Sequence, residues 1–424
     1  MLDAPRTLEK RLKIDFMGVA MITVIDSPCG FGKTQYMINM INENQTENYV
    51  YITPYLNEVK RIKESTKFLD GKLNRFVEPE ITSDNLTKMD SLIEHIGASD
   101  DIVSTHALFS NCSKELVTTI KENHYTLILD EVMNVVEVLK IRKDDLDMIL
   151  DSKRAKVVNN ELIWLKEEYD ASFNRLKELC MNHHVFIVNG TALIWTFPVE
   201  IFEAFDSIYI CTYLFDAQIQ KYYYDLYSIE YIKKSVVNSE LVDYVKQFNN
   251  TDKIHVLDNS KLNNIGKDDT ALSKSWFCRH KSNLKNVKTN LYNFVHNIAK
   301  NISGEKVTSK SIIWSTYKDY QHKLSGKGYS TSFLPFNQRA TNEYINTFVI
   351  AYMLNVYLNP TIVKYFENNS VKVDQDTYAL SELIQFIYRS RIRKGNDIYC
   401  YIPSKRMREL LYKYIDDSKN VIDI

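Results

Sequence analysis

Residues 21–34 read MITVIDSPCGFGKT, which places a short apolar run directly before a loop of small residues and a Gly-Lys-Thr triplet. The run Met21–Ile25 has the length and β-branched content of a buried strand. The residues after the triplet, QYMINMINE, are apolar at helical spacing. Small residues let successive backbone N–H groups surround phosphate oxygens at a helix N-terminus. This strand–loop–helix order predicts an α/β fold with a phosphate-binding loop after its first strand.

The loop supplies each group that a Walker A motif needs. Glycines provide backbone freedom, Lys33 can reach the β- and γ-phosphates, and the Thr34 hydroxyl can ligate Mg²⁺. Ser27 stands where the strict pattern has glycine, but serine is also small. We therefore expect ATP and Mg²⁺ as cofactors. The residues expected to hold the nucleotide are Ser27, Pro28, Cys29, Gly30, Phe31, Gly32, Lys33 and Thr34.

A later apolar strand ends in two carboxylates. The segment Tyr125–Val132 reads YTLILDEV. In P-loop enzymes the first acid at such a strand end holds Mg²⁺, and a neighbouring acid orients the attacking water. The order along the chain therefore predicts Thr34 and Asp130 as metal ligands. It also predicts Lys33, Asp130 and Glu131 as catalytic residues.

Further short apolar runs predict a parallel sheet in each half of the chain. The runs in the first half are Tyr49–Thr53, Ile102–Thr105, Leu127–Asp130, Val185–Asn189 and Ile208–Cys211. Those in the second half are Ile254–Leu257, Ile312–Trp314, Phe333–Leu334 and Ile398–Ile402. Residues 132–182 are charged and helical in period, so we expect them to pack outside the sheet. We predict two tandem α/β domains, residues 1–220 and 221–424, with a basic helical insertion or linker at residues 258–310.

Composition narrows the class of protein. The 424 residues include only 11 glycines and 8 prolines, which excludes collagen-like and Pro-rich disordered chains. A formal net charge of -1 argues against a uniformly basic nucleic-acid binder. The six cysteines form no CxxC pair, and the N-terminal apolar run is shorter than a membrane span. We expect a reduced chain without membrane association, in the cytoplasm of the host cell if it is phage-encoded.

With its motifs in this order, the chain resembles a phage-type superfamily 2 helicase of the DEAD/DEAH-related group, a P-loop NTPase with two RecA-like domains. Four more segments resemble motifs of that family: Thr53–Glu58 (motif Ia), Ser104–Leu108 (a later phosphate-gripping motif), Trp314–Thr316 (motif IV) and Asn337–Asn342 (motif V). Motif III has two candidates, Asn189–Ala192 and Thr212–Phe215. The resemblance implies nucleic acid as a partner, DNA more than RNA, together with phage replication proteins. The nucleic-acid contacts that it implies are Thr53, Pro54, Thr105, His106, Thr316, Arg339, Thr341 and Asn342.

The segment Gln385–Arg393, QFIYRSRIR, resembles motif VI, Gln-x-x-Gly-Arg-x-x-Arg. Arginines of that motif stabilise charge on the transferring phosphoryl group. Gln385 and Arg389 match the pattern, a tyrosine stands at the glycine, and the second arginine is displaced to Arg393 or Arg391. Because Arg389 and Arg393 are spaced i, i+4, one helix would present both to one ligand. The resemblance implies Gln385, Arg389 and Arg393 as catalytic residues; a basic helix that touches nucleic-acid phosphates directly is the alternative.

The leading hypothesis is an ATP-driven helicase or translocase that acts on nucleic acid in phage replication or recombination. A phage DNA-packaging motor also joins a P-loop ATPase to a second domain, but needs metal-binding carboxylates for its nuclease. The candidates are Asp374, Asp376 and Glu382, which are more typical of a helix cap and first turn. A third hypothesis is a nucleic-acid-binding module with a regulatory ATP site, against which the intact Lys33 and Asp130 speak.

Overall fold

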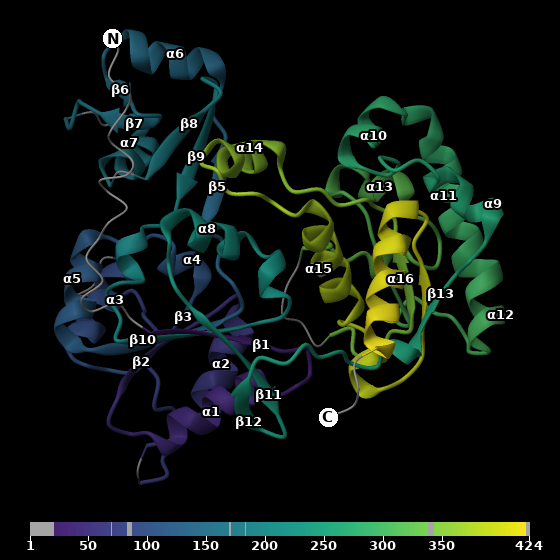
Figure 1. Cartoon of the computed structure of the whole chain (residues 1–424), viewed down its shortest axis with the longest axis horizontal. Helices are drawn as coiled ribbons and strands as arrows, with labels where there is room; N and C mark the ends of the chain where they lie inside the picture. Colours follow the sequence, from purple (N-terminus) through teal and green to yellow (C-terminus); the bar gives the residue numbers. More distant parts are fainter. Residues whose placement is uncertain are drawn as a thin grey trace. The chain divides into compact units, whose positions relative to one another are not determined.

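The computed structural model describes residues 21–68, 70–82, 87–168, 171–182, 184–337 and 343–420. The chain forms two compact units (Figure 1). The first unit contains the strand that ends at Asp26, Gly32–Tyr244 and Asn359–Val373. The second contains Ser27–Phe31, Val245–Leu358 and Asp374 onward. Of the helices in the described ranges, none combines the length and apolar character needed to cross a membrane.

A seven-stranded sheet organises the first unit, in the order β12-β11-β1-β10-β4-β2-β3. Its strands are β1 (Met21–Asp26), β2 (Asn48–Thr53), β3 (Ile102–Thr105), β4 (Tyr125–Asp130), β10 (Ser207–Thr212), β11 (Ile232–Val237) and β12 (Glu240–Asp243). All neighbours pair parallel except β11 and β12. The core positions of β1, β2 and β4 are buried without alternation, as in a sheet covered on both faces. Five predicted strands of this sheet are thereby confirmed.

The helices of this part of the first unit are α1 (Lys33–Glu43), α2 (Leu56–Ser65), α3 (Lys88–Gly97), α4 (His106–Phe109), α5 (Lys114–Asn123) and α8 (Ile219–Tyr227). The predicted domain boundary at residue 220 lies inside α8. Strand β11 follows that helix and pairs with β1, so the first unit continues to Tyr244.

The first unit also contains a five-stranded antiparallel sheet, in the order β5-β9-β8-β7-β6. Its elements are β5 (Val136–Leu139), α6 (Lys143–Asp151), β6 (Ala155–Val158), β7 (Glu161–Trp164), α7 (Asn174–Met181), β8 (Val185–Val188) and β9 (Ala192–Thr196). The helical prediction for residues 132–182 is therefore wrong in part, and β8 is not a strand of the parallel sheet. Left-handed residues at Asn159–Asn160 and Asn189–Gly190 form tight hairpin turns that direct the chain into antiparallel pairs.

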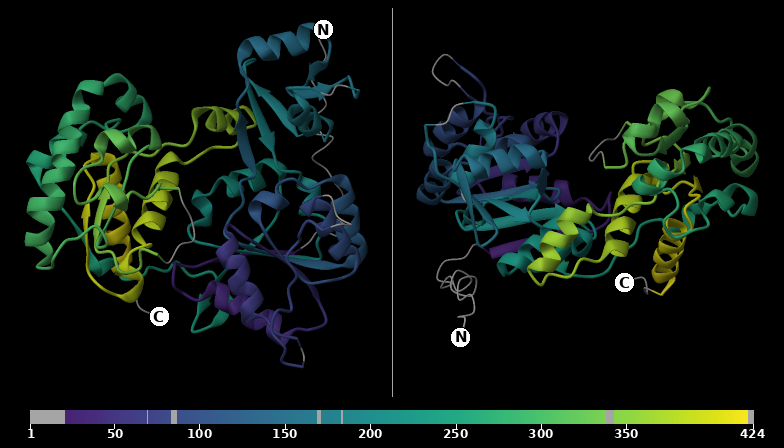
Figure 2. Two further views of the ribbon diagram at one scale, coloured as in Figure 1. Left: turned by 180° about the vertical axis from the view of Figure 1, so that it is seen from behind. Right: turned by 90° about the horizontal axis from the view of Figure 1, so that it is seen from above.

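Helix α14 (Pro360–Asn368) belongs to the first unit although it comes late in the chain. The ring of Tyr365 lies 5.8 Å from that of Phe186 in β8, and Phe366 lies 5.9 Å from Tyr222 in α8. Both views in Figure 2 show this helix beside the antiparallel strands. The contact returns the chain to the first unit before it re-enters the second.

A four-stranded parallel sheet organises the second unit, in the order β13-β16-β15-β14. Its strands are β13 (Ile254–Val256), β14 (Ile312–Ser315), β15 (Val349–Tyr352) and β16 (Ile398–Tyr401). Strand β15 was not predicted, although the apolar run Phe348–Leu354 is a signal for it. The predicted strand at Phe333–Leu334 makes only an isolated bridge from Phe333 to Trp314.

Helices cover both faces of this sheet. They are α9 (Ser260–Asn263), α10 (Lys274–Arg279), α11 (Leu284–Asn293), α12 (Ala299–Ser303), α13 (Gln321–Leu324), α15 (Gln375–Ile387) and α16 (Lys405–Lys419). Trp276 and Leu291 pack with Trp314 on one face, whereas Phe386 of α15 contacts Tyr352 on the other. Residues 258–310 are helical as predicted, but they form part of the core and not a linker. The α/β architecture with mainly parallel sheets flanked by helices is confirmed.

Candidate nucleotide site

The loop between β1 and α1 has the backbone that a phosphate-binding loop requires. Gly30 and Gly32 have φ values of 94° and 80°, a region that residues with a Cβ rarely adopt. Helix α1 begins directly after the second of these glycines, at Lys33. It has no side-chain cap and no acidic residue in its first turn. Its N-terminal N–H groups and its dipole are therefore available to an anion.

The polar ends of the parallel strands meet at one edge of the sheet. Strand register places Asp26 beside Thr212, and Asp130 beside Cys211. In open α/β sheets ligands bind at this carboxyl edge. The charge of Lys33 acts to lower the pKa of Cys211 in β10, although burial dominates and raises it. The Lys33 amine thus lies near the end of β10, next to the acidic strand β4.

The hydroxyl of Thr34 donates to the Asp130 carboxylate, at 3.1 Å from Oδ1 and 3.3 Å from Oδ2. These are the two predicted metal ligands, and they come from positions 96 residues apart in the chain. Their oxygen atoms suit Mg²⁺, which commonly takes one or two protein ligands and completes its shell with water and phosphate. The residues present therefore fit a magnesium–nucleotide complex.

The acidic pair has two unusual properties. Burial, with Glu131 adding to it, raises the pKa of Asp130 to about 6. The backbone of Glu131 has a φ of 100°, and its N–H donates to the Cys211 carbonyl at 2.9 Å. Strained backbone of this kind persists only where surrounding structure enforces it, and it concentrates at functional sites. A bound cation would offset the electrostatic cost of ionising the pair.

Replacing Asp130 by asparagine should stabilise the protein at neutral pH while it impairs hydrolysis of ATP. Because the pKa of Asp130 is raised from 3.8 to about 6, ionising this carboxyl lowers the free energy of unfolding. This loss of stability is absent at pH values below 3.8 and complete at pH values above about 6. We expect the free energy of unfolding near pH 7 to rise by roughly 1–3 kcal/mol, measured by urea denaturation. Asp145→Asn is the control, since Arg142 lowers the pKa of that exposed carboxyl and no gain is expected. If Asp130→Asn raised the free energy of unfolding by the same amount at pH 4 as at pH 7, the raised pKa of Asp130 would not be the cause.

Two charged residues near the site were not predicted. The Asp26 carboxylate accepts hydrogen bonds from the N–H groups of Leu214 at 2.8 Å and Phe215 at 3.0 Å. Arg61 in α2 pairs with Glu58 at 2.8 Å, and both act on the pKa of Asp130. Asp26 could have been found from the sequence, because it is an acid at the end of a strand and directly before the predicted phosphate-binding loop. No local sequence pattern marks Arg61.

Arg75 anchors the far end of α1. Its guanidinium donates to the carbonyl oxygens of Ile41 at 2.8 Å and Asn44 at 3.0 Å, and it forms an ion pair with Asp101. The carbonyl of Glu47 accepts another bond at 3.0 Å. A cation at a helix C-terminus is favoured by the helix dipole. Arg75 thereby positions the helix whose other end carries the nucleotide loop.

The structure separates the two candidates for motif III. Asn189–Ala192 spans the turn between β8 and β9 in the antiparallel sheet. Thr212–Phe215 follows β10, which lies between β1 and β4 in the parallel sheet. The Asp26 hydrogen bonds hold this second segment to the end of β1. Only Thr212–Phe215 therefore borders the candidate nucleotide site.

The residues expected to contact nucleic acid differ in their exposure. Thr53 and Thr105 are register partners at the ends of β2 and β3. Thr53 and Thr316 are buried, and the Thr316 hydroxyl donates to the Met353 carbonyl at 3.3 Å. Pro54, Thr105 and His106 are partly exposed. The remaining three, Arg339, Thr341 and Asn342, lie outside the described residues.

The motif VI segment is not one continuous helix. Helix α15 ends at Ile387, and Arg393 lies in a separate turn, Arg391–Lys394. The expectation that Arg389 and Arg393 share a helix face is therefore wrong. Gln385, within α15, is partly buried and donates to Ser381 Oγ at 3.4 Å. Arg389 is buried and donates to the Pro335 carbonyl at 3.3 Å.

Of the two candidates for the second arginine, Arg391 has a structural partner. It forms two bonds to the Glu305 carboxylate, at 2.6 and 3.0 Å, and lies over the ring of Phe348. The Arg393 side chain donates to the Tyr388 carbonyl. The ion pair holds Arg391 within the second unit's own structure.

Tyr388, at the glycine position of motif VI, is held by Asn249. The tyrosine is buried, and its hydroxyl donates to the Asn249 carbonyl. The Asn249 side-chain amide donates to the Cys29 carbonyl in the phosphate-binding loop at 3.0 Å. These contacts lie within the second unit, to which Ser27–Phe31 belong. They show how a large side chain is accommodated at this position.

The three carboxylates considered for a nuclease have other roles. Asp374 caps α15 by accepting from the N–H groups of Asp376 and Thr377, each at 3.0 Å. Asp376 pairs with Arg406 at 2.7 Å, and Glu382 is a buried residue of α15. Within the described ranges, no three His, Cys, Asp or Glu side chains gather as a metal site would require.

Comparisons with known proteins give the family of this chain. Residues 248–415 match the YonV C-terminal Rossmann-like domain, and residues 136–195, which correspond to the antiparallel sheet, match the YonV middle domain. Among solved structures, an XPD helicase is 12% identical with a TM-score of 0.46 and 100% coverage of both chains. The DUF1998 helicase MrfA, bound to DNA and AMPPNP, is 12% identical with a TM-score of 0.35, covering 94% of this chain and 48% of that one.

The SPbeta prophage-derived protein YonV of Bacillus subtilis (strain 168) is 42% identical over 418 residues, which span 94% of this chain and 99% of that protein. A match of this identity over nearly the whole length shows that the chain belongs to the YonV family.

Proposed function

We propose that this protein is an ATP-dependent helicase or translocase that acts on nucleic acid. The contact between Thr34 and Asp130 at the carboxyl edge of a parallel sheet carries the proposal. Thr34 and Asp130 stand at the positions that ligate the metal in P-loop ATPases. Thr34 also comes directly after a loop in which Gly30 and Gly32 have left-handed backbone. Bound ATP and Mg²⁺ would supply the phosphoanhydride bond and the charge neutralisation that its cleavage needs.

Each residue of the site has a separate proposed role in ATP hydrolysis. The Lys33 amine would bind and neutralise phosphate oxygens, and the loop N–H groups would surround them. Thr34 and Asp130 would hold the metal, and Glu131 would orient and deprotonate the attacking water. Arg389 and Arg393, with Gln385, are proposed to stabilise transition-state charge on the basis of the sequence resemblance.

The proposed partner is a nucleic-acid backbone, DNA more than RNA, in a phage process. Pro54, Thr105 and His106 support this assignment because they are partly exposed at the ends of β2 and β3, on the same edge as Asp130. Contacts of this type hold phosphate and sugar and carry no base specificity. We therefore expect binding with little dependence on sequence.

Steady-state ATPase measurements with single-stranded DNA, forked duplex DNA and RNA in parallel test the function. We expect hydrolysis to rise at least about tenfold with one of these polymers, because backbone binding completes the active arrangement. The Lys33→Ala variant is the blank for contaminating ATPases. A rate indifferent to every polymer, together with no binding to any of them, would reject the proposal.

A further inference from the structure

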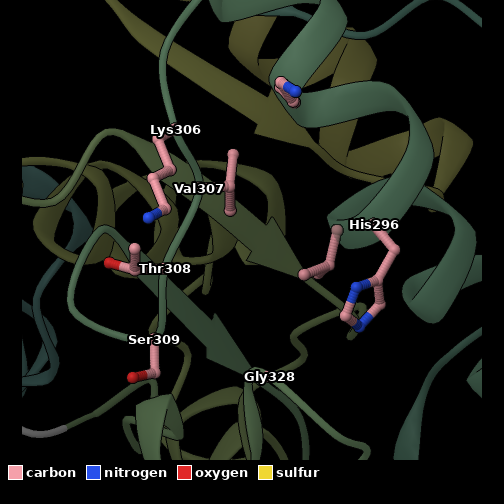
Figure 3. Close-up of a pocket in the computed structure, with 8 residues that line it drawn as sticks. His296, Lys306, Val307, Thr308, Ser309 and Gly328 are labelled. Atoms are coloured by element: carbon pink, nitrogen blue, oxygen red, sulfur yellow. The ribbon is translucent and has the colours of Figure 1, made fainter.

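A pocket of about 410 Å³ lies in the second unit, away from the nucleotide loop in sequence and on separate elements (Figure 3). Its walls come from the π-helical turn Phe294–Ile298 with the start of α12, from the residues that lead into β14, and from the turn after α13. A volume of this size is typical of a pocket for a small ligand. π-turns inside helices are rare and are frequent at functional sites.

The polar lining of the pocket is cationic and rich in hydroxyl groups. It includes Lys300, Lys306, His296, Thr308 and Ser309, and none of the described residues that line it is acidic. Neither lysine has a carboxylate within ion-pair distance in the described part of the chain. Figure 3 shows the Lys306 amine directed toward the Thr308 hydroxyl, with His296 across the pocket. Among the residues that the structure describes, no carboxylate therefore neutralises either ammonium group.

The acid nearest in sequence does not neutralise this charge. Glu305 precedes Lys306, but its carboxylate is bound on both oxygens by Arg391. The same arginine lowers the pKa of Glu305, so this carboxylate is ionised and paired at neutral pH. The pocket therefore keeps a positive potential at neutral pH.

The lining is held in place before any ligand binds. The His296 Nε2–H donates to the Lys327 carbonyl at 2.8 Å. Gly328 has a φ of 86°, and a Cβ there would lie 2.9 Å from His296 Cε1, so only glycine leaves room for the ring. The Thr308 N–H donates to Ser311 Oγ at 2.7 Å, which anchors the segment that carries the hydroxyl groups. A preformed site loses less entropy on binding.

We propose that this pocket binds a phosphate group presented by the backbone of a nucleic acid. Lysine ammonium groups and side-chain hydroxyls are common phosphate ligands in nucleic-acid-binding proteins. A free mononucleotide presents the same group, so the source must be separated by experiment. The nucleic-acid source rests on the proposed function, whereas anion binding by the pocket is independent of ATP hydrolysis.

The test removes the two lysine charges but keeps polar side chains, in the variant Lys300→Gln/Lys306→Gln. The matched control is Lys285→Gln/Lys288→Gln, which removes the same charge from exposed positions of α11 that do not line the pocket. Circular dichroism checks that each variant is folded. Binding of fluorescently labelled single-stranded DNA to the full chain is followed by anisotropy without ATP, over a range of KCl concentrations.

We expect the pocket variant to bind DNA about tenfold more weakly, with a dependence on log salt that is shallower by about one, and the control to change by less than about twofold. If DNA binding is weakened equally in both variants, or in neither, the pocket does not bind the phosphate of a nucleic acid.

Calorimetric titration of AMP and inorganic phosphate tests the pocket directly. It uses the Lys33→Ala background, so that the nucleotide loop does not contribute to binding. AMP binding lost only in the pocket variant, with DNA binding unchanged, assigns a free nucleotide. If the wild-type protein binds no nucleic acid, the proposed function fails, but the calorimetric titration still shows whether the pocket binds an anion. If the pocket binds neither DNA, AMP nor inorganic phosphate, the proposal for the pocket is overturned.

Discussion

Replacing Lys33 with alanine should reduce nucleic-acid-stimulated ATP hydrolysis by about 100- to 1,000-fold. The residue begins α1 directly after the left-handed Gly32, and its amine lies near the end of β10, beside the acidic strand. Removing one preorganised cation from a phosphoryl-transfer site costs about 3–4 kcal/mol of transition-state stabilisation. A coupled assay at saturating nucleic acid measures the effect.

Lys60→Ala is the control for this prediction. Lys60 lies in α2, its side chain is 77% exposed, and it forms an ion pair with Glu64 at 3.7 Å. We expect its ATPase rate to stay within about twofold of wild type. A Lys33→Ala enzyme that retains more than about a tenth of the wild-type rate would mean that the loop is not the catalytic site.

Replacing Arg75 with methionine should destabilise the first unit by about 3–5 kcal/mol. Its side chain is buried, bonded to three backbone carbonyls and paired with Asp101, which also accepts the Tyr49 N–H at 2.7 Å. Methionine has a similar length but no donor, so the buried carboxylate and carbonyls lose their partner. Chemical denaturation followed by circular dichroism measures the loss.

The matched substitution for Arg75 is Arg142→Met. Arg142 also pairs with an aspartate, Asp145, at 3.0 Å, but its side chain is 83% exposed. Water replaces the partner at such a site, so we expect a change within about 0.5 kcal/mol. Similar losses for both variants would show that burial of Arg75 does not determine its importance. Because Arg75 holds the C-terminal end of α1, its loss should also weaken ATP binding at the other end.

The nucleotide loop could be predicted because each of its parts is local. A strand of continuous apolar residues, two glycines with left-handed backbone and a helix that begins at Lys33 follow one another within a few residues. Their conformations depend mainly on neighbours in the chain. The same holds for β4 and its terminal Asp130.

The middle sheet and the arginine segment could not be predicted in this way. Strands β6 and β7 have four residues each and are too short for a period to be recognised. Helix α15 ends at Ile387, where the next residue, Tyr388, is buried against Asn249. The helical pattern that was extended through Arg393 therefore does not hold beyond Ile387.

The sequence by itself determined the α/β class, the glycine-containing loop after β1 and the acidic end of strand β4. Only the tertiary structure brought Thr34 to Asp130, selected Thr212–Phe215 as the segment beside the site, and paired Arg75 with Asp101. The reason is physical: backbone conformation and apolar periodicity arise from residues within one or two turns of each other. Which strands lie side by side, and which charges meet, depends on surfaces that are far apart in the chain and come together only in the folded protein.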